Sequence, residues 1–258
     1  MPIVSLITDF GYRDFYVGVL KGHLLKAAPM AQLVDICHQV EPFNISEAAF
    51  VLRNAYEAFP ENTLHIICVN QLEGSAQKQV AVRHNEHFFI GPDNGLFSMA
   101  FDQEPELVYE LELYKQTNTD FTSLNQLIAQ SAGHLLAGKE LQQLGRPVFQ
   151  VRQLANLAPV VQNNVLKGSV IYIDAFQNAV LNIHRDFFEQ QRAGRNYAIF
   201  FKRSERITEI SRYYYEAPEG EKLCIFNTNG YLEIAINKGK AAGLLGLHIG
   251  DTVQIEFV

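Results

Sequence analysis

One aspartate, Asp9, stands where a carboxylate could hold a small ligand. It follows directly after the apolar run 3–8. Ligands of open α/β sheets bind beyond the carboxyl ends of the strands, so a carboxylate at this place could accept two hydrogen bonds from a ribose diol. The alternative is an aspartate that only caps a helix or a turn. The sequence has neither G-x-G-x-x-G nor G-x-x-x-x-G-K-[S/T], so nothing supports a dinucleotide fold or a P-loop.

The elements that would position Asp9 follow from the hydrophobic pattern. Short apolar runs, typical of buried parallel strands, occur at 3–8, 32–36 and 63–69. Apolar residues at helical spacing predict helices between them, over 16–28 and 44–59. Asn44, with Glu47 three residues later, resembles a capping box at the start of the second helix. This alternation predicts a three-layer α/β domain over residues 1–150 with a mostly parallel sheet.

The pattern changes after residue 150. Residues 151–165 have no clean period and are predicted to be a linker. From residue 166 onward one short apolar run follows another, and helical spacing is confined to 240–244. This predicts a smaller, all-β barrel domain over 166–258. The predicted strands are 169–173, 179–183, 197–201, 222–226, 231–236 and 252–257.

The composition excludes several classes of function. Of 258 residues, 48% are hydrophobic and 19% are charged, so we expect a packed core and no extensive disorder. The formal net charge of -7 argues against nonspecific binding to nucleic acid or to an anionic membrane. No apolar stretch approaches the ~20 residues that span a bilayer, and the first residues predict a strand and not a signal peptide. We therefore expect a cytoplasmic protein with reduced cysteines.

Four segments resemble, in order, the motifs of one enzyme family. Residues 8–22 read T-D-F-G-x-x-D-x-Y-V-G-x-x-K-G, and residues 92–96 read P-D-N-G-L. Residues 174–183 read D-A-F-Q-N-A-V-L-N-I, and residues 229–242 read N-G-Y-L-E-I-A-x-N-x-G-x-A-A. The chain thereby resembles the SAM-dependent fluorinases and chlorinases and the adenosine-forming SAM hydrolases. The resemblance spans nearly the whole chain.

The resemblance implies a fold, an assembly and a ligand site. The family has an α/β N-terminal domain and a β-barrel C-terminal domain, and forms homotrimers that hold SAM between domains of neighbouring subunits. Asp9 would hold the ribose hydroxyls, Phe43 would be an aromatic wall and Asp174 would face the methionine ammonium. Phe176 and Asn178 would hold adenine, and Thr228 and Asn229 would lie near the methionine carboxylate. These pairings are chemically sensible, since an ammonium favours a carboxylate and a flat base favours an aromatic face.

The catalytic positions of the hydrolases are all substituted in this chain. The hydrolases of the family carry a D-P-G-V-G loop after the third strand, an arginine beyond it and a later F-H-G-R-D segment. Here the loop reads N-Q-L-E-G over 70–74, so Asn70 takes the aspartate position. Gln77 takes the arginine position, and Ser123 takes the histidine position. An amide cannot accept the proton that an attacking water loses, and general-base assistance is worth ~10²–10⁴-fold in rate.

Three interpretations of this substitution stay open. Glu73 in the altered loop could be another base, although a solvated loop carboxylate is the simpler interpretation of this residue. Asn70, Thr122 and Ser123 could instead offer neutral donors to a halide, which needs no base. The protein could also bind SAM or adenosine without turnover. Asn70, Glu73 and Ser123 are therefore the candidate catalytic residues.

The expected activity is hydrolysis of S-adenosylmethionine to adenosine and L-methionine by displacement at C5′. SAM is the substrate, and we expect no metal and no cofactor. Non-catalytic binding of SAM or adenosine is the alternative. His84 and His87, which flank a predicted hairpin turn, are interpreted as solvated turn residues and not as metal ligands. Tyr213 to Tyr215 are interpreted as an edge strand or an interface patch.

Overall fold

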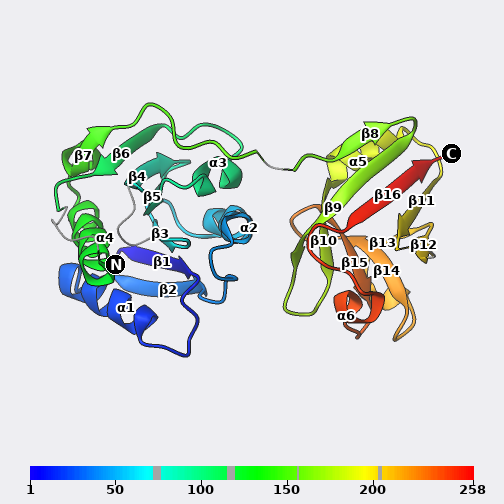
Figure 1. The fold of residues 1–258 in the computed structure, drawn as a ribbon, viewed down its shortest axis with the longest axis horizontal. Coiled ribbons are helices and arrows are strands. Elements are labelled where there is room, and N and C mark those ends of the chain that lie inside the picture. The colour runs from blue at the N-terminus through cyan, green and yellow to red at the C-terminus, as the bar shows by residue number, and fades with distance from the viewer. Residues whose placement is uncertain (72–76, 115–119, 156, 203–204) are drawn as a thin grey trace. The chain divides into compact units, whose positions relative to one another are not determined.

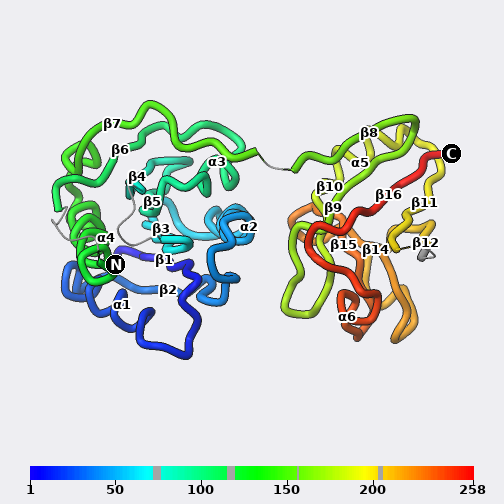
Figure 2. The backbone as a smooth tube through the Cα atoms, in the orientation of Figure 1, coloured from blue at the N-terminus to red at the C-terminus, as the bar shows by residue number. Residues whose placement is uncertain are grey.

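The computed structural model describes residues 1–71, 77–114, 120–155, 157–202 and 205–258. They divide into two compact units, Met1–Ala155 and Asn156–Val258. Each unit has a sheet of its own (Figure 1), and the path of the chain through the elements can be followed in Figure 2. Among the described residues no helix is long and apolar enough to span a membrane.

The sheet of the first unit has a parallel half and an antiparallel half. Its strand order is β2-β1-β3-β5-β4-β6-β7. The neighbours β2, β1, β3 and β5 run parallel, and β4, β6 and β7 continue the sheet in antiparallel fashion. The strands are β1 (Ile3–Thr8), β2 (Gln32–Cys37), β3 (Leu64–Cys68), β4 (Gln79–His84), β5 (His87–Pro92), β6 (Leu107–Leu111) and β7 (Gly145–Pro147).

Helices cover both faces of this sheet, which confirms the predicted α/β class. One core cluster joins Leu6 and Ile66 to residues of α1 (Tyr16–Ala27) and α4 (Phe121–Leu136). The other joins Ile7 and Ile67 to residues of α2 (Ile45–Ala55) and α3 (Leu96–Ala100). Because β1 and β3 are buried on both faces, their sequences are mostly apolar, and the polar residues Ser5 and His65 bond to each other. Figure 1 shows the two helix layers. Short 3-10 turns lie at Tyr56–Ala58 and Leu141–Leu144.

The predicted capping interaction of α2 is present in modified form. The Asn44 side chain accepts a hydrogen bond from the Glu47 backbone N–H at 3.1 Å, as an N-cap does. The Glu47 carboxylate accepts from the Glu41 backbone N–H at 3.0 Å and not from the N-cap residue. The cap therefore also fixes the loop that leads from β2 into α2.

The interpretation of His84 and His87 as solvated residues is wrong. Their side chains are buried, with 3% and 4% exposure, at the paired ends of β4 and β5. The His84 ring stacks on Phe101 with centroids 4.1 Å apart, and His87 Nδ1 lies 3.2 Å from Nε2 of His65. Burial lowers the pKa of both His84 and His87. They stabilise the core in the neutral form.

The second unit is the smaller, nearly barrel-shaped β domain that the sequence predicts. Its strand order is β12-β11-β16-β9-β10-β15-β14-β13, with β8 paired to β9. The core contains Leu166, Leu181, Ile199, Ile234 and Ile255. The strands are β8 (Val160–Gln162), β9 (Val165–Ile173), β10 (Ala179–His184), β11 (Tyr197–Phe201), β12 (Glu205–Ile207), β13 (Ile210–Ser211), β14 (Lys222–Phe226), β15 (Tyr231–Ile236) and β16 (Thr252–Phe257). Strand β8 lies inside the segment 151–165 that is predicted as a linker.

Two local features of this unit differ from the sequence prediction. Beside α6 (Ala241–Leu245) it contains a second helix, α5 (Arg185–Arg192), of which only Phe188 is buried. Its two core-contacting residues, Phe187 and Phe188, are adjacent in the sequence and therefore give no helical period. Tyr213 to Tyr215 are not an edge strand. They lead into a 3-10 turn, Tyr214–Glu216, and the rings of Tyr213 and Tyr215 stack with centroids 5.1 Å apart.

Candidate functional site

Asp9 fixes three loops at the carboxyl edge of the parallel strands. Its Oδ2 atom accepts hydrogen bonds from the backbone N–H groups of Phe43 and Asn70, both at 3.0 Å. Phe43 precedes α2, and Asn70 follows β3, so one carboxylate joins the ends of β1, β2 and β3. Both donors have positive φ, 68° for Phe43 and 53° for Asn70, a conformation that costs non-glycine residues roughly 1 kcal/mol. Such strain is found at binding sites more often than elsewhere.

The other carboxylate oxygen of Asp9 is available for a ligand. Within the described ranges of the chain, no group donates a hydrogen bond to Oδ1. Asp9 is half-buried, and the Phe43 ring beside it is 66% exposed. Asp9 Oδ1 can therefore accept a hydrogen bond from a ligand hydroxyl, next to the exposed ring of Phe43.

A chain of contacts supports the Asp9 loop, and it runs from the buried residues Thr8 and His38 to Asp35 and Lys21 at the surface. Thr8 Oγ1 lies 2.8 Å from His38 Nδ1, and the His38 carbonyl accepts the Gly11 N–H at 2.7 Å. His38 Nε2 lies 3.0 Å from Asp35 Oδ1, and Lys21 Nζ lies 2.7 Å from Asp35 Oδ2. Although burial opposes it, the contacts with Lys21 and His38 hold the pKa of Asp35 below its usual value. Sequence reasoning missed this chain, whose only signal is the D-x-x-H spacing of 35–38.

The candidate catalytic residues occupy different parts of the first unit. Asn70 contacts Asp9 through its backbone. Ser123 lies in the first turn of α4, where its N–H donates to the N-cap Asp120 at 2.8 Å. Phe121, at the start of α4, packs edge-on against Phe10 with centroids 5.6 Å apart, so this helix end lies beside the Asp9 loop. Glu73 lies outside the described residues.

In the second unit, Asp174 organises the turn that joins β9 to β10. Its Oδ1 accepts the backbone N–H groups of Phe176 at 2.9 Å and Asn178 at 2.7 Å. Its Oδ2 accepts the Asn178 side-chain amide at 3.0 Å. Gln177 takes a φ of 67° within this turn. A carboxylate has about four lone-pair sites, so Oδ2 can still accept a cationic donor.

A hollow of about 540 Å³ opens beside this turn. This volume is within the range of small-ligand pockets. The Phe176 ring is 77% exposed here, and Asn178 is buried. A flat base could stack on Phe176 and bond the Asn178 amide, because the bond to Asp174 uses only one of its two N–H donors. The lining includes Phe176, Asn178, Tyr214, Ile236, Lys238 and Lys240. Sequence reasoning did not identify Tyr214 in this role.

Thr228 and Asn229 form an exposed turn between β14 and β15. The Asn227 side chain accepts the backbone N–H groups of Asn229 at 3.1 Å and Tyr231 at 3.0 Å. Gly230 has a φ of 80°, and the His184 ring would be 2.3 Å from an added Cβ. The turn therefore presents Thr228 and Asn229 on a rigid base.

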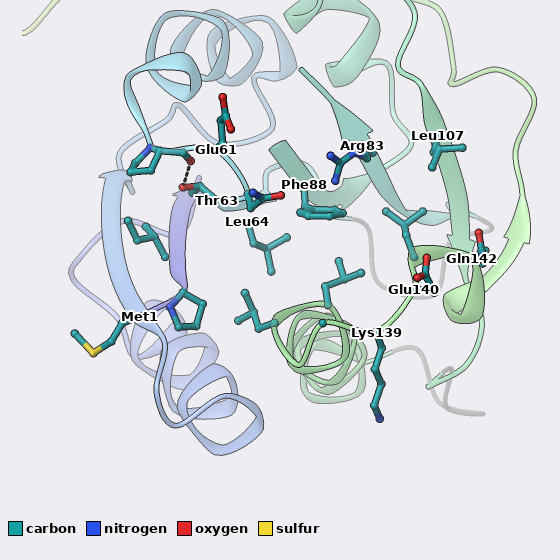
Figure 3. Close-up of a pocket in the computed structure, with 18 residues that line it drawn as sticks. Met1, Glu61, Thr63, Leu64, Arg83, Phe88, Leu107, Lys139, Glu140 and Gln142 are labelled. Carbon is teal, nitrogen blue, oxygen red and sulfur yellow. Dashed lines mark hydrogen bonds between the residues drawn. The ribbon is translucent and has the colours of Figure 1, made fainter. Parts of the chain in front are cut away.

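The first unit also contains a larger hollow, of about 720 Å³, far from Asp9 along the strands. It lies at the amino ends of β1 and β3 and is lined by Leu64, Phe88 and Lys139 (Figure 3). Asp9 is beyond the opposite end of β1. Because ligands of parallel sheets bind at carboxyl ends, the larger volume does not make this hollow the candidate site. Across the described part of the chain, no cluster of three or more His, Cys, Asp or Glu residues could hold a metal.

Comparison with known proteins assigns the family. The model of the SAM hydroxide adenosyltransferase N-terminal domain matches residues 4–145, and that of the C-terminal domain matches residues 168–254. The chain belongs to this family. It is 30% identical to an (R)-S-adenosyl-L-methionine hydrolase of Thermus thermophilus over 99% of this chain and 100% of the relative. It is 26% identical to a fluorinase of Nocardia brasiliensis over 99% of this chain and 97% of the relative.

A solved structure also matches the SAM hydroxide adenosyltransferase fold of this chain. The crystal structure of an uncharacterized conserved protein from Thermotoga maritima has a TM-score of 0.88 and 30% identity. The match covers 98% of this chain and 99% of that one. The resemblance stated from the motifs is thereby confirmed, as is the predicted fold class.

Proposed function

We propose that this protein hydrolyses S-adenosylmethionine to adenosine and L-methionine. A water oxygen forms the new bond to C5′, the C5′–S bond breaks, and its electron pair stays on sulfur, which leaves as the thioether of methionine. The attacking water loses one proton. The sulfonium is a good leaving group that needs neither an acid nor a metal, so we expect no cofactor.

The observation that carries the proposal is Asp9 with its open Oδ1 atom, in a chain that matches the hydrolases of the family over its full length. Asp9 Oδ1 accepts the ribose hydroxyls, and Phe43 supplies an aromatic surface. Phe176 and Asn178 bind adenine, and Asp174 Oδ2 binds the methionine ammonium. Thr228 and Asn229 bind the methionine carboxylate through neutral donors.

This chain differs from the family pattern in the group that accepts the proton of the attacking water. Asn70 and Ser123 hold the positions of the hydrolase aspartate and histidine, and neither is a base. We propose that Asn70 and Ser123 orient the water and that Glu73 accepts its proton. Positioning in line with the C–S bond is retained by the bound substrate, so displacement survives at a lower rate.

A second candidate function is the binding of SAM or adenosine without turnover. The substitution of all three hydrolase groups at once favours it, because each group acts on the same water. Incubation of the pure protein with SAM, followed by chromatography for adenosine and methionine, separates the two functions. Product formation supports hydrolysis, and calorimetric binding with no product after long incubation supports the binder.

The assembly and location complete the proposal. We propose a homotrimer in the cytoplasm, with SAM as the small-molecule partner and no membrane or nucleic-acid partner. The described free cysteines, Cys37, Cys68 and Cys224, suit a reducing compartment. Size-exclusion chromatography with light scattering tests the mass, for which a monomer of 29.2 kDa is the contrary result.

A further inference from the structure

The glutamate Glu233 is a buried carboxylate of the second unit. Its exposure is 3%, in the middle of β15. The neighbouring residues Leu232 and Ile234 point into the barrel core, so Glu233 lies on the other face of the strand. Among the residues that the structure describes, no Lys, Arg or His forms an ion pair with it. Burying a carboxylate without a counter-charge destabilises the folded protein. Residues that depart in this way from the usual pattern of burial concentrate at functional positions.

Neutral donors and a second carboxylate surround Glu233. The Tyr214 hydroxyl donates to Oε1 at 2.7 Å, and the Asn227 side chain also bonds the carboxylate. Burial raises the pKa of Glu233, and the negative charge of Asp174 acts in the same direction. The Cys224 thiol, in the neighbouring strand β14, is close enough to sense the charge of Glu233. In the sheet, Glu233 pairs with Val180 of β10, and the adjacent residue, Ala179, pairs with Ile173, which directly precedes Asp174.

The partners of Glu233 belong to two separate parts of the proposed site. Tyr214 lines the hollow with Phe176 and Asn178. Asn227 holds the turn of Thr228 and Asn229. Glu233 therefore connects the wall of the proposed adenine pocket to the turn proposed for the methionine carboxylate.

We propose that Glu233 is a positioning residue that also selects for a cationic ligand, through its bonds to Tyr214 and Asn227 and through the negative potential it adds beside Asp174. This inference rests on the proposed function. SAM carries a sulfonium and an ammonium, whereas adenosine is neutral. The charge of Glu233 thus favours the substrate over the nucleoside product, and its hydrogen bonds favour both ligands equally.

Two variants separate the charge from the hydrogen bond. Glu233→Gln removes the charge and leaves an oxygen for the Tyr214 hydroxyl. We expect its affinity for SAM to fall about tenfold while its affinity for adenosine changes less than twofold, since only SAM has charges that sense the loss. Tyr214→Phe keeps the charge and loosens the pocket wall. We expect this variant to lose affinity for SAM and adenosine by the same factor.

The experiment is isothermal titration calorimetry of SAM and of adenosine against the wild type, both variants and a control, with circular dichroism to check folding. Glu256→Gln is the matched control, because it removes an exposed carboxylate from strand β16 of the same domain. It should bind both ligands as the wild type does.

SAM affinity equal in the wild type and Glu233→Gln overturns this inference alone. Equal losses of SAM and adenosine affinity in Glu233→Gln, or unfolding of this variant, assign Glu233 a purely structural role and also overturn it. Failure of the wild type to bind SAM overturns the proposed function and this inference with it.

Discussion

The backbone N–H of Asn70 donates to Oδ2 of Asp9 at 3.0 Å. The residue that stands in the aspartate position of the hydrolases is therefore attached, through its main chain, to the carboxylate proposed to hold the ribose. Substrate binding and the altered catalytic loop therefore use the two oxygens of one carboxylate, Oδ1 for the ribose and Oδ2 for the loop. This contact decides how changes at either residue should behave.

Asp9→Ala should weaken both the fold and the ligand site. Two backbone N–H groups lose their acceptor, and we expect the free energy of unfolding to fall by about 1–3 kcal/mol. Affinity for SAM should fall more than tenfold. Asp9→Asn keeps an oxygen for the two N–H groups, so it should recover most of the stability. Urea unfolding and calorimetry measure the two quantities, and Glu61→Ala, an exposed change in the same unit, is the control. A stable Asp9→Ala protein with full SAM affinity would contradict this role of Asp9.

Asn70→Asp alone should not restore a fast hydrolase. The change adds a carboxylate to a residue whose backbone bonds Asp9, and it supplies no cationic partner for the new charge. The combination of Asn70→Asp, Gln77→Arg and Ser123→His supplies the missing charge partner and base. We expect it to raise kcat by roughly 10²-fold or more over the wild type. Steady-state formation of adenosine checks this, and a triple variant no faster than Asn70→Asp alone would be evidence against it.

Glu73→Gln tests the identity of the base. If Glu73 accepts the proton, the variant should lower kcat by about 10²-fold, with a small effect on the Kd for SAM. Ser123→Ala should have a smaller effect, since a hydroxyl only orients the water. Single-turnover kinetics measure the rate of the chemical step, and calorimetry measures the Kd for SAM. Unchanged turnover in Glu73→Gln would show that bulk solvent, and not Glu73, accepts the proton of the attacking water.

The buried histidines of the first unit predict a loss of stability in acid. Burial lowers the pKa of His65 to about 3, and the nearby His87 adds to the shift. Below pH 6.5 the unfolded chain binds a proton at His65 that the folded chain does not, so the free energy of unfolding falls between pH 6.5 and about 3. The loss from this group should be on the order of 5 kcal/mol.

His65→Gln isolates this effect. Glutamine keeps a hydrogen-bonding partner for Ser5, whose Oγ lies 2.6 Å from His65 Nδ1, but it does not titrate. The slope of Tm against pH should be flatter in the variant than in the wild type. The exposed residue His248 offers the comparison His248→Gln, which should change the slope less than His65→Gln does. Identical slopes in all three proteins would show that His65 does not govern acid sensitivity.

The sequence predicts elements well where burial has a clear period. Strands β1 and β3 are mostly apolar because both of their faces are covered. Asn44 is recognisable as a cap from local spacing alone. Helix α5 is not predicted because only the adjacent residues Phe187 and Phe188 pack against the core, which gives no helical period. The prediction for His84 and His87 was wrong because residues beside a tight turn are usually exposed. In the structure Phe101, from a later part of the chain, covers His84.

The sequence predicts which residue types form the site, but it does not predict the hydrogen bonds that join them. The contact between Asp9 and Asn70 joins positions 61 residues apart, which no local pattern encodes. Asp174 was expected to face a ligand, yet most of its bonds hold its own turn. Glu233 was read only as part of a motif, because its burial depends on how Tyr214 covers β15. Long-range packing determines each of these features.

The central claim is displacement at C5′ of SAM by water. Incubation of the wild-type protein with SAM in water labelled with oxygen-18, followed by mass spectrometry of the adenosine formed, tests it most directly. The account predicts adenosine with the label in its 5′-hydroxyl, together with unlabelled L-methionine. Intact SAM after long incubation, or adenosine without the label, would contradict it.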